Sequence, residues 1–268
     1  MKIAHIINPV KVGESSDLFV AQPITFETMR RAKDYAGSEM DIELYSSQYS
    51  EDHGIIPDYF MKTLDLDRSV LDLGQFQVPR KLPILKDILD RLYEASDADY
   101  FIYTNSDIGL MPYFYLTIKK LIEDGHDSFV INRRTISDKY KEIDEIPQMC
   151  SEVGEPHKGY DCFVFKREDY PKYVLGDVCL GIAWVGRALL ANLFVNTNKF
   201  YEFKNLHMTF HLGNTWNWKK EKYADYTEHN KKEFINIMNT LDRNHDILDS
   251  QARSYLMDSG PQRHQLFS

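Results

Sequence analysis

Short runs of hydrophobic residues alternate with amphipathic stretches along the first half of the chain. Four runs have the length and composition of buried strands, and they cover residues 3–7, 40–45, 100–103 and 129–131. Three stretches between them have hydrophobic positions at helical spacing, beginning at or just after a proline, and they cover residues 23–35, 85–92 and 112–124. Residues 46–80 are polar and weakly patterned, so we expect a long excursion with little regular structure. The alternation predicts an α/β fold in which helices flank a central, mostly parallel sheet.

The second half of the chain has a less regular pattern. Strands are expected at 161–165 and, as one strand or two, within 201–211; helices are expected at 183–192 and 225–238. In the last of these helices, the expected inward-facing residues are Phe234, Ile235 and Met238. The sequence turns polar at Arg243. These patterns predict a single domain over residues 1–242, followed by a C-terminal tail at 243–268.

Composition and charge exclude several classes of function. The chain has 268 residues, of which 43% are hydrophobic and 13% aromatic, enough to form a sizeable core. Lys and Arg number 32 against 41 Asp and Glu, and the formal charge is −9. Nucleic-acid binders normally carry a basic surplus, because their affinity depends on neutralising phosphates. We therefore expect no nucleic-acid partner and no polybasic membrane anchor.

The cysteines and the N-terminus indicate the compartment. Cys150, Cys162 and Cys179 are few, odd in number and without a Cys-x-x-Cys pair, so we expect buried, reduced thiols rather than a disulfide framework or a zinc site. The first residues contain no signal-peptide core, and no hydrophobic stretch is long enough to span a membrane. The expectation is a soluble, cytoplasmic protein with no transmembrane anchor.

The most informative polar cluster follows the hydrophobic run at 100–103, where the sequence continues Thr104-Asn105-Ser106-Asp107. Ligands of open α/β sheets bind outside the carboxyl ends of the strands. A carboxylate at that edge is a hard oxygen donor suited to Mg²⁺ or Mn²⁺, and such an ion would neutralise a diphosphate. The alternative is a polar turn that only caps the following helix.

This segment resembles the Asp-x-Asp signature of the GT-A class of nucleotide-sugar-dependent glycosyltransferases. The resemblance implies a GT-A-like, Rossmann-like fold with a nucleotide-binding half at 1–134 and an acceptor and metal half at 135–242. It also implies that Asp107 holds a divalent metal at the donor diphosphate, and that Asn8 and Pro9, at the end of the first strand, lie near the base and ribose. Asn105 replaces the first acid of the signature and is expected to hydrogen-bond a ribose hydroxyl or a metal-bound water, although it is a weaker ligand than a carboxylate.

A second candidate metal ligand lies in the segment His207-Met208-Thr209-Phe210-His211-Leu212-Gly213. Neutral imidazole binds Mn²⁺ or Zn²⁺ well. The segment loosely resembles the C-terminal part of some GT-A families, in which a histidine completes the metal site, and His211 is the preferred ligand. A zinc hydrolase is disfavoured because the segment lacks the glutamate of the His-Glu-x-x-His pattern. A structural role in an aromatic stretch is the alternative for both histidines.

Two arginines follow the strand at 129–131. Arg133 and Arg134 are candidates for binding the donor diphosphate, because guanidinium groups match phosphate oxygens and a leaving diphosphate needs positive charge. Arg133 is preferred. A surface pair that balances nearby acids is the alternative.

The Gly- and Pro-rich loop at 154–161 supplies the candidate catalytic carboxylates. An inverting transferase needs a base for the acceptor hydroxyl, and Asp161 and Glu155 are the nearest acids. Asp161 is preferred because the following strand would hold it in position. An acid that only binds backbone amides is the alternative. The sequence does not decide between an inverting and a retaining mechanism.

A turn at 181–187 supplies candidate substrate-binding residues. Trp184 could stack on a sugar ring, and Arg187 could hold a charged group of the acceptor. Core packing is the alternative for this tryptophan, and equally for Trp216 and Trp218.

These observations predict a metal-dependent glycosyltransferase that moves a sugar from a nucleoside-diphosphate sugar to an acceptor hydroxyl, with Mn²⁺ or Mg²⁺ as cofactor. The acceptor is a glycan, a lipid-linked sugar or a small molecule. One alternative is a non-catalytic nucleotide- or carbohydrate-binding protein on the same fold, which Asn105, in place of the first acid of the signature, leaves open. A sugar nucleotidyltransferase is less consistent, because residues 8–14 lack the Gly-rich, basic loop that would hold a nucleoside triphosphate.

Overall fold

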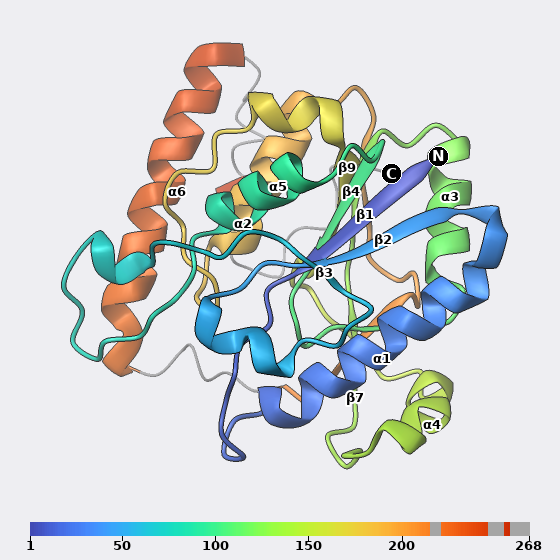
Figure 1. The fold of residues 1–268 in the computed structure, drawn as a ribbon. Helices are drawn as coiled ribbons and strands as arrows, with labels where there is room; N and C mark the ends of the chain where they lie inside the picture. Colours follow the sequence, from blue (N-terminus) through green and yellow to red (C-terminus); the bar gives the residue numbers. More distant parts are fainter. Residues whose placement is uncertain (215–220, 246–254, 258–268) are drawn as a thin grey trace.

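A seven-stranded sheet of order β10-β6-β9-β4-β1-β2-β3 forms the centre of the computed structural model, which describes residues 1–214, 221–245 and 255–257 (Figure 1). Its strands are β1 (Lys2–Ile7), β2 (Asp41–Ser46), β3 (Met61–Lys62), β4 (Tyr100–Thr104), β6 (Ser128–Ile131), β9 (Cys162–Lys166) and β10 (Phe200–Phe203). All neighbouring strands run parallel except β9, which is antiparallel to both β4 and β6. The predicted mostly parallel sheet is therefore confirmed.

Helices cover both faces of this sheet (Figure 1). The core on one face includes residues of α1 (Leu18–Ala36) and α3 (Phe114–Glu123). The core on the other face includes residues of α2 (Leu85–Ala95), α5 (Val185–Asn196) and α6 (Ala224–His245). Every residue of β4 and β6 is buried, as expected of strands covered on both sides. The fully buried positions of α2 are those of the sequence pattern: Leu85, Ile88, Leu89 and Leu92.

A smaller sheet of order β5-β11-β7-β8 lies at the carboxyl ends of the parallel strands. Its strands are β5 (Gly109–Leu110), β7 (Arg134–Ile136), β8 (Glu155–Pro156) and β11 (Thr209–Leu212). The short helix α4 (Ile146–Ser151) precedes β8. The remaining regular segments are 3₁₀ turns: η1 (Gly37–Glu39), η2 (Ser50–Ile55), η3 (Val70–Asp72), η4 (Ile143–Glu145), η5 (Arg167–Lys172) and η7 (Glu221–Tyr223). Residues 46–80 contain two of these turns and the two-residue β3, so the expected irregular excursion is confirmed.

Two helices begin elsewhere than predicted. α1 begins at Leu18, and Pro23 lies inside it rather than in its first turn. Pro23 is exposed to solvent. The first turns of α1 are stabilised by Gln22, whose side chain accepts from the Val10 amide at 2.8 Å and donates to the Val10 carbonyl at 2.8 Å. α5 begins at Val185, two residues later than predicted.

The C-terminal part of the chain contributes more to the core than a tail would. The expected boundary at residue 242 falls inside α6, and Tyr255 and Leu256 are buried in the core. The inward face of α6 includes Phe234 and Met238 as predicted, but Ile235 is 38% exposed and Ile237 is buried. Residues three or four apart share a face of a helix, so Ile237, and not Ile235, lies on the same face as Phe234. Trp216 and Trp218 lie outside the described residues.

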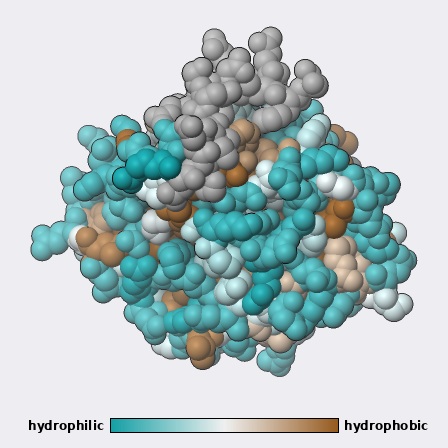
Figure 2. Space-filling model, turned by 90° about the horizontal axis from the view of Figure 1, so that it is seen from above, coloured by the Kyte–Doolittle hydropathy of each residue, from teal (hydrophilic) through white to brown (hydrophobic). Residues whose placement is uncertain are grey.

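The surface shows no large hydrophobic area on the face drawn in Figure 2, where hydrophobic residues form small separate patches among hydrophilic ones. None of the helices in the described part of the chain is long and apolar enough to span a membrane. The three cysteines are free thiols, with Cys162 and Cys179 buried and Cys150 partly exposed.

Candidate active site

Four polar segments meet at one edge of the large sheet. Asn8 follows β1, Asn105 follows β4 and Arg133 follows β6, so their positions at that edge are expected of parallel strands. Asp161 joins them because β9 is antiparallel and begins at this edge. Cys162, the first residue of β9, pairs with Thr104 on one side and with Ile131 on the other.

Asp107 and His211 lie against each other, 104 positions apart in the sequence. The His211 Nε2 atom is 3.3 Å from Asp107 Oδ2, and the His211 Nδ1 atom is 2.8 Å from the Gly213 carbonyl oxygen. The carbonyl accepts only from a protonated Nδ1, so in the neutral imidazole the Nε2 atom beside the carboxylate is the one that carries the lone pair. Gly213 has a φ of +65°, and this turn brings its carbonyl back to the imidazole.

The pair has the features of a divalent-cation site. Asp107 Oδ1 is buried and has no hydrogen-bond partner among the described residues. The pair offers a carboxylate with an orphaned oxygen and an imidazole that is oriented by a carbonyl. Such donors suit Mn²⁺ or Mg²⁺ when substrate phosphates complete the coordination. Within the described ranges no group of three or more potential ligand side chains occurs, so the protein would supply two of the ligands.

Asp161 is the buried acid at the centre of the site. Its side chain is 8% exposed; Oδ1 accepts from Arg133 Nη1 at 2.9 Å, and Oδ2 is 3.7 Å from His157 Nδ1. Burial alone raises the pKa of Asp161, but the positive charge of Arg133 and the interaction with His157 outweigh burial and hold the pKa below its usual value. The carboxylate is therefore ionised in the folded protein.

Asn105 lines the cleft and is partly exposed, and its side-chain amide contacts Asp161. Tyr103 donates its hydroxyl to Asn105 Oδ1 at 3.1 Å, and the Asn105 amide nitrogen is 3.5 Å from Asp161 Oδ1. An acid at position 105 would place a second carboxylate beside Asp161. The amide in its place avoids that repulsion and adds a donor to the ionised acid.

A cleft of about 1310 Å³ opens over these residues. Of the residues expected from the sequence to form the site, the cleft is lined by Asn8, Asn105, Asp107, Arg133, Asp161, Trp184, Arg187 and His211. Pro9, Arg134 and Glu155 do not line it. Arg134 instead donates from Nη2 to the Gly154 carbonyl at 2.8 Å, and Glu155 is exposed on β8.

Trp184 has a strained backbone where the cleft meets α5. Its φ is +78°, the left-handed region that a bulky residue rarely adopts. The indole ring packs on Phe234 at 5.3 Å between ring centroids, and the Arg187 guanidinium lies over the indole ring, 4.6 Å from its centroid. These contacts hold Trp184 and Arg187 together along the wall of the cleft.

Several residues of the site had no signal in the sequence. Asp52, from the irregular excursion, lines the cleft and accepts from the Lys11 amide at 2.7 Å. His157 and Tyr160 line it from the loop that also carries Asp161. Their proximity in sequence to Asp161 was the available hint. His207 lies in the turn before β11 and does not line the cleft; its carbonyl accepts from the Tyr113 hydroxyl at 3.1 Å.

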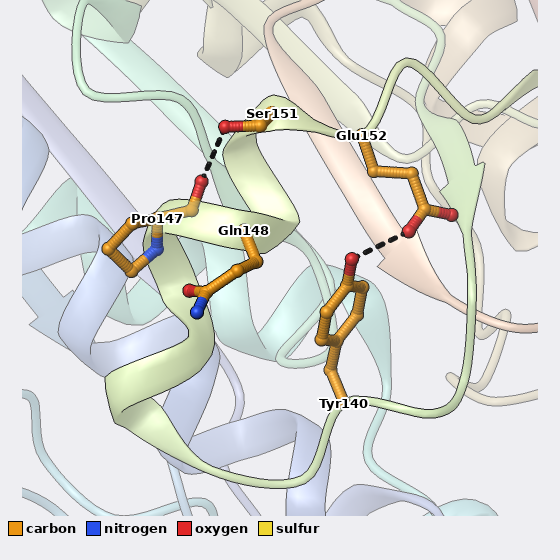
Figure 3. A pocket seen from close by; sticks show the side chains of 5 residues that line it. All are labelled: Tyr140, Pro147, Gln148, Ser151 and Glu152. Atoms are coloured by element: carbon orange, nitrogen blue, oxygen red, sulfur yellow. Dashed lines mark hydrogen bonds between the residues drawn. The ribbon is translucent and has the colours of Figure 1, made fainter.

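A second, shallow pocket of about 430 Å³ lies beside α4 (Figure 3). Two pairs of its polar groups bind each other: Tyr140 donates to Glu152 at 2.8 Å, and Ser151 donates to the Pro147 carbonyl at 2.8 Å. This pocket is separate from the cleft and contains none of the candidate site residues.

Solved structures share the fold of this chain. No protein-family model and no curated protein sequence matches it. The structure of S. aureus TarS residues 1–349 in complex with UDP-GlcNAc superposes with a TM-score of 0.52 and 10% identity, covering 100% of this chain and 74% of that one. The glucosyl-3-phosphoglycerate synthase of Mycobacterium tuberculosis, in complex with Mn²⁺, UDP and glucosyl-3-phosphoglycerate, gives 0.50 and 15%, covering 93% and 81%.

At these identities the likeness concerns the fold. In both comparisons the match extends over the large sheet and its helices, since at least 93% of this chain is covered. The mostly parallel sheet with helices on both of its faces is thus a GT-A-like fold.

Proposed function

We propose that the protein is a metal-dependent glycosyltransferase that moves a sugar from a nucleoside-diphosphate sugar to an acceptor hydroxyl. The observation that carries the proposal is the Asp107–His211 pair, with its orphaned carboxylate oxygen, at the edge of the sheet. Further support comes from the neighbours of the same fold, which were solved with UDP-GlcNAc and with UDP and Mn²⁺.

Asp107 and His211 would hold Mn²⁺ or Mg²⁺, and the bound ion would supply the positive charge that a departing diphosphate requires. Arg133 adds to that charge from β6. Its side chain is 13% exposed, and its Nε atom has no partner among the described residues. A guanidinium with one nitrogen on Asp161 and another unpaired can therefore bind a phosphate oxygen without losing its ion pair.

Asp161 would accept the proton of the acceptor hydroxyl. It is ionised, held by Arg133 through one oxygen, and its other oxygen, Oδ2, has no hydrogen-bond partner among the described residues. A fixed, ionised acid with a free oxygen is the form that a general base requires. Glu155 is outside the cleft, so Asp161 is the proposed base.

The donor and acceptor would occupy different parts of the cleft. Asn8, at the end of β1, lies on the side proposed for the base and ribose, while Trp184 and Arg187 form the side proposed for the acceptor. The acceptor is a glycan, a lipid-linked sugar or a small molecule that carries a hydroxyl group. Uridine nucleotides are the first donors to test, since the neighbours hold them.

The decisive experiment measures nucleotide binding by thermal shift with UDP, GDP, CDP and ADP, each with and without Mn²⁺. A ligand at one hundred times its dissociation constant stabilises a fold by about 2.7 kcal/mol. We expect one nucleotide to stabilise the protein strongly only when Mn²⁺ is present. Asp107→Asn should abolish that metal-dependent shift, because the variant keeps the shape of the side chain but loses its charge.

Glu155→Gln is the matched control. It also removes a negative charge, but from an exposed residue on β8 that does not line the cleft, so its shift should equal that of the wild type. If nucleotide binds equally well without metal and no sugar is transferred, the protein is a non-catalytic binder. If Asp107→Asn retains the full shift, the metal assignment is wrong.

A further inference from the structure

The last described residues of the chain, 255–257, lie behind the acceptor side of the cleft. Tyr255 and Leu256 are 4% and 0% exposed and belong to the same core as α5 and α6. The Leu256 side chain of this segment packs in the core. The Tyr255 hydroxyl and the Met257 carbonyl form hydrogen bonds to other parts of the chain, described below.

The Tyr255 hydroxyl joins a buried polar network. It donates to Glu202 Oε2 on β10, and Asn132 Nδ2 donates to Glu202 Oε1 at 2.9 Å. Tyr160, which lines the cleft next to Asp161, also interacts with the Tyr255 phenol. Burial, chiefly, raises the pKa of the Tyr255 phenol, so the hydroxyl keeps its proton and remains a donor.

The Met257 carbonyl holds the other residue of the wall. It accepts from Arg187 Nη1 at 3.1 Å. The same guanidinium lies over the indole of Trp184, and Phe234 of α6 packs on the indole as well. The position of Arg187 over Trp184 therefore depends on a main-chain atom near the end of the chain.

We propose that residues 255–257 brace the acceptor side of the cleft, with Tyr255 as a positioning residue for Tyr160 and the Met257 carbonyl as the anchor of Arg187 over Trp184. The name "acceptor side" rests on the proposed function, but the brace itself is a structural claim that can be tested without substrate. Tyr255 and Met257 do not line the cleft, so their effect on it acts through these two residues.

Losing the Tyr255 hydroxyl should loosen this wall. Glu202 is 9% exposed and would lose one of its donors, which a buried carboxylate tolerates poorly. The loss of one ordinary hydrogen bond shifts the equilibrium between the held and the released form of the wall by about fivefold toward the released form. In the released form, Arg187 no longer covers the indole of Trp184.

Acrylamide quenching of Trp184 fluorescence tests the brace directly. The chain has three tryptophans, so Trp216→Phe and Trp218→Phe together leave Trp184 as the fluorophore in the full-length protein. In that background, Tyr255→Phe should raise the quenching constant, and Arg187→Gln should raise it at least as much. Tyr255→Phe keeps the ring in the core, and quenching is measured well below the melting temperature.

Tyr140→Phe is the matched control. It removes the hydroxyl of another buried tyrosine that donates to a glutamate, in the separate pocket beside α4 (Figure 3). We expect it to leave Trp184 quenching unchanged. If Tyr255→Phe also leaves it unchanged while Arg187→Gln raises it, the brace is overturned. Thermal shift with UDP and Mn²⁺ on the same proteins tests the proposed function separately, since its failure would leave the quenching result intact.

Discussion

The ionised state of Asp161 is the residue-scale property on which the proposed chemistry depends. An acid of this burial would normally be neutral, and the ion pair with Arg133 keeps it charged. Because its folded pKa is below the unfolded value, the pair contributes stability above the usual pKa of an aspartic acid. That contribution disappears as the pH falls through the folded pKa.

Asp161→Asn should lower the turnover number by about 10² to 10⁴-fold, the usual contribution of a general base, while nucleotide affinity in Mn²⁺ changes little. Steady-state transfer kinetics and a nucleotide titration on the same preparation measure both quantities. Glu155→Gln is the control, because Glu155 is exposed on β8 outside the cleft. A large loss of turnover in Glu155→Gln and none in Asp161→Asn would reverse the assignment of the base.

At the scale of elements, a close contact between β5 and β11 sets the distance between the two proposed metal ligands. Gly109, two residues after Asp107, pairs with Phe210, which immediately precedes His211. A Cβ atom at residue 109 would lie 2.4 Å from the Phe210 ring, so only glycine allows this approach. Phe210 is 1% exposed, so its ring lies in the close-packed interior, where a displacement is costly.

Gly109→Ala should therefore lower the free energy of unfolding by about 1–3 kcal/mol, the usual cost of overpacking. It should also weaken the Mn²⁺-dependent nucleotide shift, because β11 moves away with His211. Urea denaturation and thermal shift measure the two effects. Gly54→Ala is the control, since a Cβ there meets nothing within 4 Å. Equal stability of the two variants would show that the β5–β11 contact is not tight.

For the molecule as a whole, a buried histidine in the central strand makes stability depend on pH. His5 of β1 is fully buried between Tyr115 of α3, 2.8 Å from Nδ1, and Thr104 of β4, 2.9 Å from Nε2. Burial lowers its pKa to about 3. Between that value and the unfolded pKa of about 6.5, the unfolded chain binds a proton that the folded one does not. Stability is therefore lost as the pH falls below about 6.5.

His5→Gln should remove this part of the pH dependence. At pH 5, about 1.5 units below the unfolded pKa, His5 costs about 2 kcal/mol of stability relative to neutral pH. Urea unfolding at pH 7.5 and pH 5 should therefore show a decrease smaller by about this amount in His5→Gln than in the wild type. The comparison of differences cancels any constant effect of the substitution. Identical decreases would mean that His5 titrates normally in the folded protein.

Most strands of the large sheet and the helices that flank it followed from the sequence by itself, whereas the short strands β3, β5, β7 and β8 and the short helix α4 did not. Hydrophobic periodicity predicted β1, β2, β4 and β6 and the amphipathic α2, because each buries the same side chains whatever its neighbours are. Pro23 misled the prediction of α1, since its local preference for a first turn yielded to the contacts that Gln22 makes with Val10. The strand-end positions of Asn105, Asp107 and Arg133 were also visible in the sequence.

The composition of the site was decided by the tertiary structure. Asp161 joins Arg133 because β9 inserts antiparallel between β4 and β6, and Asp107 meets His211 because β11 pairs with β5. Glu155 and Arg134, the less preferred candidates in the sequence, face elsewhere because β7 and β8 pair with each other. Local pattern determines which side chains a strand buries, whereas strand order and register bring distant residues together. Those depend on packing over the whole chain, which no local pattern records.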